Sequence, residues 1–270
     1  NPLYHNNLEQ YVDNHMIPQM KDLVTRYEPD IVWTDGEWDH PSEKWKSTSF
    51  LAWLYNESPV KDKVCVNDRW GKETRGVHGG YFTTEYDMVH GQKELSDIPR
   101  PWEECRGIGN SFGYNRIENT EHYMTSDGLV DLLIKKVSAG GNLLLNVGPT
   151  ADGRIPVIQQ QRLLDMGKWL NVNGEAIYST RKWEGSSMNQ SENVFFTKKG
   201  NDLYVLCTEI PHNPIEIKGI KKKGNVKMLG FDGKVNTKKK GNTMTIDIPV
   251  VTPAKNPSDH AWVFKIENAI

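Results

Sequence analysis

The sequence of 270 residues predicts an α/β fold over its first two-thirds and an antiparallel β-sandwich over the remainder. Amphipathic helical segments alternate with short apolar segments up to about residue 180, which is typical of parallel β/α units. Beyond that point, short segments of alternating polarity are separated by turn residues, which is typical of a sandwich. We therefore expect one domain over residues 1–180 and a second over residues 181–270.

The first predicted helix covers about residues 7–28, because its apolar residues recur at three- and four-residue steps. Pro29 disfavours helical backbone in the residue before it and so ends this helix. Residues 31–33 are apolar, as in a buried parallel strand. We expect Asp35 to stand where that strand ends and Gly36 to turn the chain behind it.

Further helices and strands alternate along the rest of the first domain. We expect a helix over Ser42–Asn56, a strand over Val64–Asn67, a helix from Asp127 as its cap to about Ser138, a strand over Leu143–Val147 and a helix over Ile155–Val172. Residues 70–125 are rich in glycine and aromatic residues and only weakly periodic, so we expect a functional loop region there.

The second domain contains five predicted strands. They cover residues 194–197, 203–207, 226–229, 244–248 and 261–266. Two lysine runs, Lys221–Lys223 and Lys238–Lys240, lie beside glycines. We interpret both runs as solvated turn residues rather than as a binding patch.

Composition excludes several classes of partner. The formal net charge is −2, so there is no electrostatic basis for binding nucleic acid or an anionic membrane. No apolar run is long enough to span a membrane. The three cysteines form neither a disulfide framework nor a zinc pattern, and we expect Cys65 and Cys207 to be inert core residues.

Eight blocks along the chain carry a more specific signal. They are Tyr27–Trp38, Phe50–Asn56, Val66–Gly71, Gly79–Glu85, Ser111–Asn115, Gly140–Pro149, Asp152–Gly153 and Trp169–Tyr178. In this order and together, they resemble the retaining α-L-fucosidases of glycoside hydrolase family 29. The resemblance covers roughly the first two-thirds of the chain.

The resemblance implies an architecture and an activity. The chain would be the C-terminal portion of a (β/α)8 barrel followed by a C-terminal β-sandwich, and an N-terminal half with about three further β/α units would precede Asn1. The enzyme would remove terminal α-L-fucose from oligosaccharides or glycoconjugates, without a metal or other cofactor. We expect an extracytoplasmic location, either periplasmic or secreted, or lysosomal in a eukaryote. The resemblance does not decide whether the enzyme forms a homo-oligomer.

The resemblance also assigns the two carboxyl groups that a retaining glycosidase needs. Asp35 matches the nucleophile, although an Asp-Gly pair can also serve only as a turn. Glu85 resembles the acid/base of bacterial-type members, and a solvated loop glutamate is the plainer interpretation. Glu37, Asp87 and Glu103 are the alternatives for the acid/base.

Three further residues match substrate-binding positions. Arg69 would hold a sugar hydroxyl or orient the nucleophile, or it would only form an ion pair with Asp68. Trp33 would line the sugar pocket. Phe112 would contact the C5 methyl group of fucose, or it would only pack in the core.

Two competing hypotheses belong to other functional classes. The first is a catalytically silent relative that binds fucose or has a structural role, and the presence of both Asp35 and Glu85 counts against it. The second is a metal-dependent hydrolase that uses the carboxylates of Asp35, Glu37 and Asp39. No convergent histidine and aspartate spacing supports that reading.

Overall fold

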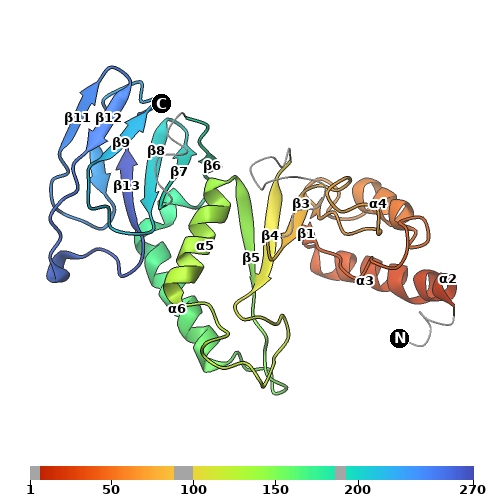
Figure 1. The fold of residues 1–270 in the computed structure, drawn as a ribbon. Coiled ribbons are helices and arrows are strands. Elements are labelled where there is room, and N and C mark those ends of the chain that lie inside the picture. The colour runs from red at the N-terminus through yellow and green to blue at the C-terminus, as the bar shows by residue number, and fades with distance from the viewer. Residues whose placement is uncertain (1–6, 88–99, 186–192) are drawn as a thin grey trace. The chain divides into compact units, whose positions relative to one another are not determined.

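The computed structural model describes residues 7–87, 100–185 and 193–270, and the chain divides into two compact units. The first unit ends at Glu104 and the second covers Cys105–Ile270. Figure 1 shows the helices and strands of both units, and each unit is described by itself below.

The first unit begins with the predicted amphipathic helix. It consists of α2 (Leu8–Tyr11), a single π-helical segment η1 (Val12–Met16) and α3 (Ile17–Tyr27), so the expected helix is confirmed with one irregularity. Asn7 caps its start by accepting a hydrogen bond from the backbone of Gln10. Glu28 takes a left-handed conformation at its end, directly before Pro29.

Two short strands of the first unit form a parallel pair. In this pair β1 (Ile31–Val32) lies beside β2 (Cys65–Val66), with Ile31 opposite Cys65. Helix α4 (Ser47–Asn56) connects them, as expected for a parallel crossover. The predicted start of this helix at Ser42 is wrong, because a turn precedes it and Lys46 has a left-handed backbone.

The region expected to be irregular contains two strands. Strand β3 (Phe82–Glu85) lies beside the beginning of β4 (Trp102–Gly107) in the first unit. The glycine and aromatic content of residues 70–125 concealed these strands, since neither segment shows a clean alternation of apolar and polar residues.

The second unit contains two long helices, α5 (Ser126–Ser138) and α6 (Val157–Asn173), and the strand β5 (Gly141–Asn146), which is hydrogen-bonded to β4 in the sheet order β3-β4-β5. Helix α5 packs against both β5 and helix α6. A 3₁₀ turn (Gly174–Ala176) follows α6. The side chain of Thr125, rather than that of Asp127, caps α5 by accepting a hydrogen bond from the backbone of Gly128.

Two antiparallel sheets complete the second unit and form the predicted sandwich. The five-stranded sheet has the order β10 (Val226–Met228), β13 (Trp262–Ile266), β8 (Asp202–Cys207), β7 (Val194–Lys199) and β6 (Arg181–Lys182). The three-stranded sheet has the order β11 (Thr237–Lys240), β12 (Thr243–Ile246) and β9 (Ile215–Lys218). Leu203 and Phe264 of the first sheet share one buried core with Ile217 and Met244 of the second.

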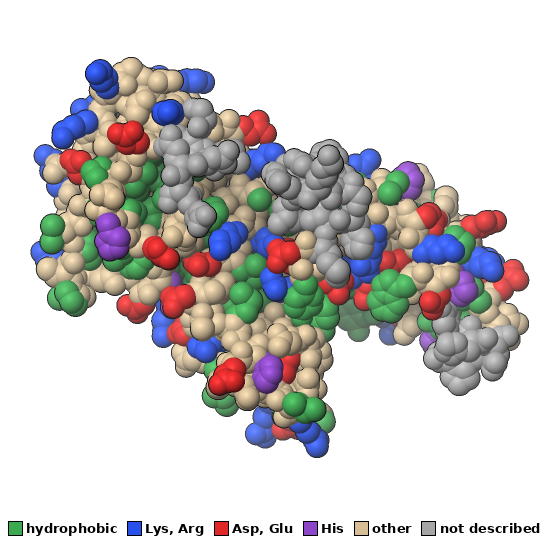
Figure 2. Space-filling view, viewed as in Figure 1, with side chains coloured by type: hydrophobic (Ala, Val, Ile, Leu, Met, Phe, Trp, Pro, Cys, Tyr) green, Lys and Arg blue, Asp and Glu red, His purple; other side chains and the backbone are tan. Residues whose placement is uncertain are grey.

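The structure of the sandwich differs in two ways from the strands and turns expected from the sequence. Strands β6, β9 and β11 were not predicted, and Lys238–Lys240 lie in the edge strand β11 instead of a turn. Charged side chains on an edge strand disfavour pairing with another chain. Basic side chains are dispersed over the visible face of the sandwich and do not form one patch (Figure 2).

Two smaller expectations can also be compared with the structure. Cys207 is buried and free, as expected for a core residue, and burial raises the pKa of its thiol to about 12, whereas Cys65 is only partly buried. No helix within residues 7–87, 100–185 and 193–270 is both long and apolar enough to cross a membrane.

Candidate active site

Asp35 lies three residues beyond the end of strand β1, and the buried side chain of Asn67 fixes this segment. The Nδ2 group of Asn67 donates a hydrogen bond to the backbone carbonyl of Thr34 at 2.8 Å, and its Oδ1 accepts one from the Thr34 hydroxyl at 3.1 Å. Gly36 follows with a φ of 91°, a conformation that favours glycine. The carboxylate of Asp35 is therefore held just beyond the strand while 41% of its side chain stays exposed.

Arg69 connects the two carboxylates that the sequence assigned to catalysis. Its side chain is only 2% exposed, and its Nη1 group donates a hydrogen bond to Oδ1 of Asp35 at 2.8 Å. Its Nη2 group lies 3.2 Å from Oε2 of Glu85. One guanidinium thus contacts both carboxylates, so Asp35 and Glu85 are neighbours of the same buried side chain.

A chain of buried hydrogen bonds holds Arg69 itself in place. The Oγ1 atom of Thr83 accepts a hydrogen bond from Nε of Arg69 at 3.0 Å and donates one to Asp68 at 2.7 Å. Asp68 also accepts hydrogen bonds from the backbone amides of Thr83 and Gly76. The alternative role of Arg69, an ion pair with Asp68 alone, does not describe these contacts.

A second arginine, which the sequence analysis missed, enters the same cluster. Arg75 Nη2 donates a hydrogen bond to Oδ1 of Asp35 at 3.2 Å, and its Nη1 lies 3.6 Å from Oε2 of Glu85. Its Nε donates one to Oε1 of Glu37 at 2.5 Å. Arg75 lies in an irregular loop, and it belongs to no motif that the sequence analysis used. The sequence alone therefore did not indicate a role for it.

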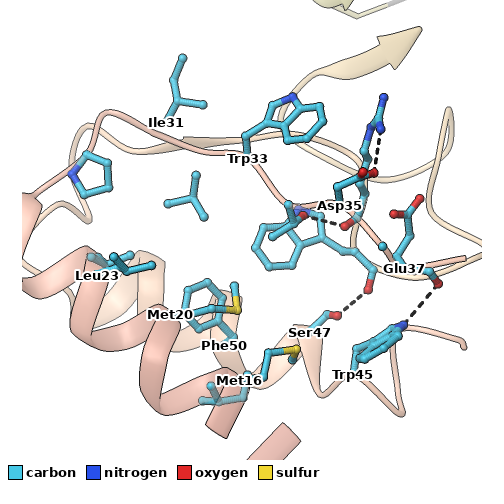
Figure 3. Close-up of a pocket in the computed structure, with 18 of the residues that line it drawn as sticks. Met16, Met20, Leu23, Ile31, Trp33, Asp35, Glu37, Trp45, Ser47 and Phe50 are labelled. Carbon is cyan, nitrogen blue, oxygen red and sulfur yellow. Dashed lines mark hydrogen bonds and ion pairs between the residues drawn. The ribbon is translucent and has the colours of Figure 1, made fainter. Parts of the chain in front are cut away.

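Glu37 is buried and lies at one end of a largely apolar cavity of about 550 Å³ in the first unit. Figure 3 shows Met16, Met20 and Leu23 of the helical segment facing Ile31 and Trp33, with Asp35 and Glu37 at the end of the cavity. The side chain of Glu37 is 5% exposed, against 23% for Glu85, so Glu37 is less accessible to a sugar and a poorer candidate for proton transfer.

Trp33 connects the site to Glu103, another alternative for the acid/base. Its indole Nε1 donates a hydrogen bond to Oε1 of Glu103 at 3.0 Å, and the guanidinium of Arg69 lies 4.6 Å from its ring centroid. Burial raises the pKa of the Glu103 carboxyl above its ordinary value, against the opposing effects of the Trp33 hydrogen bond and the Arg69 charge.

The remaining candidates are placed differently. Phe112 lies in the second unit, where it is partly buried and its backbone carbonyl accepts a hydrogen bond from Asn146 at 2.6 Å. Its contact with fucose stays a prediction. Asp87 is exposed and has a left-handed backbone conformation. The described part of the chain contains no group of three or more His, Cys, Asp or Glu side chains that could hold a metal ion.

Two carboxylates that contact one buried guanidinium, beside a tryptophan, suit the chemistry of a glycoside hydrolase, which works with a pair of carboxyl groups. The family profile described as alpha-L-fucosidase matches residues 2–175, and the profile of the alpha-L-fucosidase C-terminal domain matches residues 188–267. The chain therefore belongs to the α-L-fucosidase family, and the resemblance found in the sequence is confirmed.

Individual relatives agree with the family profiles. Tissue alpha-L-fucosidase of Homo sapiens is 38% identical over 267 residues, and that of Bos taurus is 40% identical over 268 residues. In each alignment 96% of this chain is covered, but only 56% of the human protein and 55% of the bovine protein. The chain thus spans about half the length of these relatives.

Solved structures with a similar fold include two bacterial fucosidases. The alpha-fucosidase of Thermotoga maritima, in complex with a mechanism-based inhibitor, has a TM-score of 0.75 and 35% identity, over 95% of this chain and 56% of that one. Alpha-L-fucosidase isoenzyme 1 from Paenibacillus thiaminolyticus has a TM-score of 0.78 and 27% identity, over 97% of this chain and 65% of that one.

Proposed function

We propose that the whole protein is a retaining exo-α-L-fucosidase that hydrolyses terminal α-L-fucose from glycans or glycoconjugates. The observation that carries this proposal is the bridge of Arg69 between Asp35 and Glu85, in a chain of the α-L-fucosidase family. Double displacement at such a pair forms a covalent fucosyl-enzyme and then hydrolyses it. The two carboxyl groups and water suffice for both steps, so the proposal includes no cofactor.

Asp35 is the proposed nucleophile. Its Oδ1 atom accepts hydrogen bonds from both Arg69 and Arg75, and 41% of its side chain is open to an incoming sugar. Oδ2 is the oxygen that attacks the anomeric carbon, because Oδ1 is already engaged. The positive charge beside Asp35 also stabilises the carboxylate when it leaves in the second step.

Glu85 is the proposed acid/base. It first protonates the leaving oxygen and then accepts a proton from the attacking water. Its support is its position at the end of β3, where it contacts the same guanidinium as Asp35. Glu103 is the second candidate, because its raised pKa suits a group that must donate a proton.

The proposal assigns substrate contacts to three residues. Trp33 offers an aromatic face near the nucleophile, and Arg69 orients the carboxylate of Asp35 and holds a sugar hydroxyl. Phe112 contacts the C5 methyl group of fucose. Hexoses with a hydroxyl at C6 fit this apolar contact less well.

The proposal extends to the architecture and location of the whole enzyme. Residues up to about 180 form the later part of a (β/α)8 barrel, and additional β/α units of the enzyme cover apolar side chains such as Leu23 and Ile31, which are 50% and 54% exposed. The family's relatives include plasma and tissue enzymes, and we propose an extracytoplasmic location for this one as well.

The test is an assay of the full-length enzyme on an aryl α-L-fucoside, with the anomer of the product followed by NMR. The proposal requires α-L-fucose as the first product, because two displacements retain configuration. A β-anomer would contradict the nucleophilic role of Asp35. A folded enzyme that binds fucose without hydrolysing the fucoside would instead support a catalytically silent relative.

A further inference from the structure

Arg75 is a charged residue of the site that the proposed mechanism does not itself require. Its side chain is 13% exposed, and its guanidinium contacts Asp35, Glu37 and Glu85. The shortest of these contacts, 2.5 Å, joins Nε to the buried carboxylate of Glu37. Three carboxylates from two segments of the first unit therefore converge on one loop arginine.

We propose that Arg75 is a positioning residue that orients the nucleophile and is itself held by Glu37. Together with Arg69 it fixes Oδ1 of Asp35, which leaves Oδ2 to face the anomeric carbon. This inference rests on the proposed function, because it assigns Arg75 a task in the same reaction.

The first argument concerns the orientation of Asp35. The terminal torsion of an aspartate is broad, so a carboxylate held by one donor can still rotate. The side chain of Asp35 is also 41% exposed, and the residue precedes Gly36, which has a positive φ. Two guanidinium groups that donate to the same oxygen, at 2.8 and 3.2 Å, restrict this rotation. A misplacement of about 1 Å can cost about 100-fold in rate, so such a restriction matters for catalysis.

The second argument concerns Glu37. Its carboxylate is buried, and within the described residues its Oε2 atom has no hydrogen-bond partner. A buried carboxylate is stable only beside a compensating charge, and Arg75 supplies that charge. In return, Glu37 fixes the Nε edge of the guanidinium, so that both Nη groups point to Asp35 and Glu85. This pairing explains why a buried glutamate stands two residues after the nucleophile.

The experiment compares Arg75 variants of the full-length enzyme on an aryl α-L-fucoside. Arg75→Gln removes the charge and the fork, and Arg75→Lys keeps the charge alone. The double variant Arg75→Gln with Glu37→Gln removes the unpaired buried charge that a simple loss of Arg75 would leave. Arg154→Gln is the matched control, because Arg154 forms an exposed ion pair with Asp152 in the second unit.

We expect kcat and kcat/KM of Arg75→Gln to fall together by about 10- to 100-fold, the pattern of an interaction that serves the transition state. Arg75→Lys should recover part of this loss. The double variant should regain thermal stability but not kcat, and Arg154→Gln should match the wild type.

Three results would overturn the proposal. A folded Arg75→Gln enzyme with wild-type kcat would show that the nucleophile needs no second guanidinium. Full recovery of kcat in the double variant would mean that Arg75 only neutralises Glu37. A wild-type enzyme without fucosidase activity would contradict the proposed function itself, and the Arg75 proposal would fall with it.

Discussion

The first unit buries many polar side chains beside its apolar core, whereas the β-sandwich buries almost only apolar ones. Among the described residues of the first unit, ten polar or charged ones are buried, including Asn67, Asp68 and Arg69, whereas Thr197 is the one such residue among those described between 193 and 270. Conversely, several large apolar side chains of the first unit are exposed, such as Leu23, Tyr27 and Ile31. The sandwich core contains fully buried side chains from both of its sheets.

This difference indicates what each region does. Apolar burial stabilises the sandwich with little requirement for exact partners. Buried polar groups need specific hydrogen bonds, so the network of Asn67, Asp68 and Thr83 fixes geometry around Asp35. Substitutions of the partly exposed Asp35 and Glu85 should therefore change the rate more than the stability, and substitutions in the sandwich core should do the reverse.

The largest effect is expected for Asp35→Gly. The full-length variant should lose at least about 10⁴-fold in kcat, because no other group replaces the nucleophile. Its thermal stability should change little, since Asp35 is partly exposed. Azide should restore part of the activity by occupying the vacated space, and the product should be measured by NMR. Turnover like that of the wild type would remove Asp35 from the mechanism.

Glu85→Ala should give a selective loss. A natural fucosyl-sugar has a poor leaving group and should lose about 10²- to 10⁴-fold in kcat/KM, the usual contribution of general acid catalysis. An aryl fucoside with a good leaving group should keep most of its first step, and the fucosyl-enzyme should accumulate as a burst in stopped-flow measurements. Equal losses for both substrates would transfer the role to Glu103 or Asp87.

Phe264→Ala tests the role of apolar burial in the sandwich core. Phe264 is 1% exposed in the sandwich core, so the truncation should cost about 3–5 kcal/mol of unfolding free energy. Denaturant unfolding measures this loss, and kcat per folded molecule should be unchanged. The control is Val250→Ala, an apolar truncation at a residue that is 91% exposed, which should cost almost nothing. A kcat that falls with Phe264→Ala would show that the two regions are coupled.

The smallest effect is expected for Glu103→Gln, and it depends on pH. Burial raises the pKa of Glu103 in the folded protein, so the folded state binds its proton more tightly than the unfolded state. Wild-type stability should therefore fall as pH rises from the ordinary glutamate value, about 4.3, through the raised value. The glutamine should still accept the Trp33 hydrogen bond and remove this decline, which thermal unfolding across pH 4–8 would detect. If the variant instead shows the selective kinetics expected for Glu85→Ala, Glu103 is the acid/base.

The local pattern of apolar and polar residues predicted most of the helices and strands. Helical periodicity marked the segment from Leu8 to Tyr27, and apolar runs marked β1, β2 and β5, because side-chain burial repeats along each element with its own period. Short or mixed strands escaped this reasoning. Strand β9 carries the charged residues Glu216 and Lys218 among its four, and β11 carries three lysines on an edge.

By itself, the sequence determined the family, the order of the elements and the place of Asp35 just after a strand, since each of these depends on residues that are contiguous in the chain. Only the tertiary structure decided which charged groups surround that carboxylate. Arg75 lies 40 positions from Asp35, and Glu103 lies 70 positions from Trp33, yet both pairs are in contact. Such contacts arise where loops from different strands converge, and the spacing of residues along one segment carries no information about that convergence.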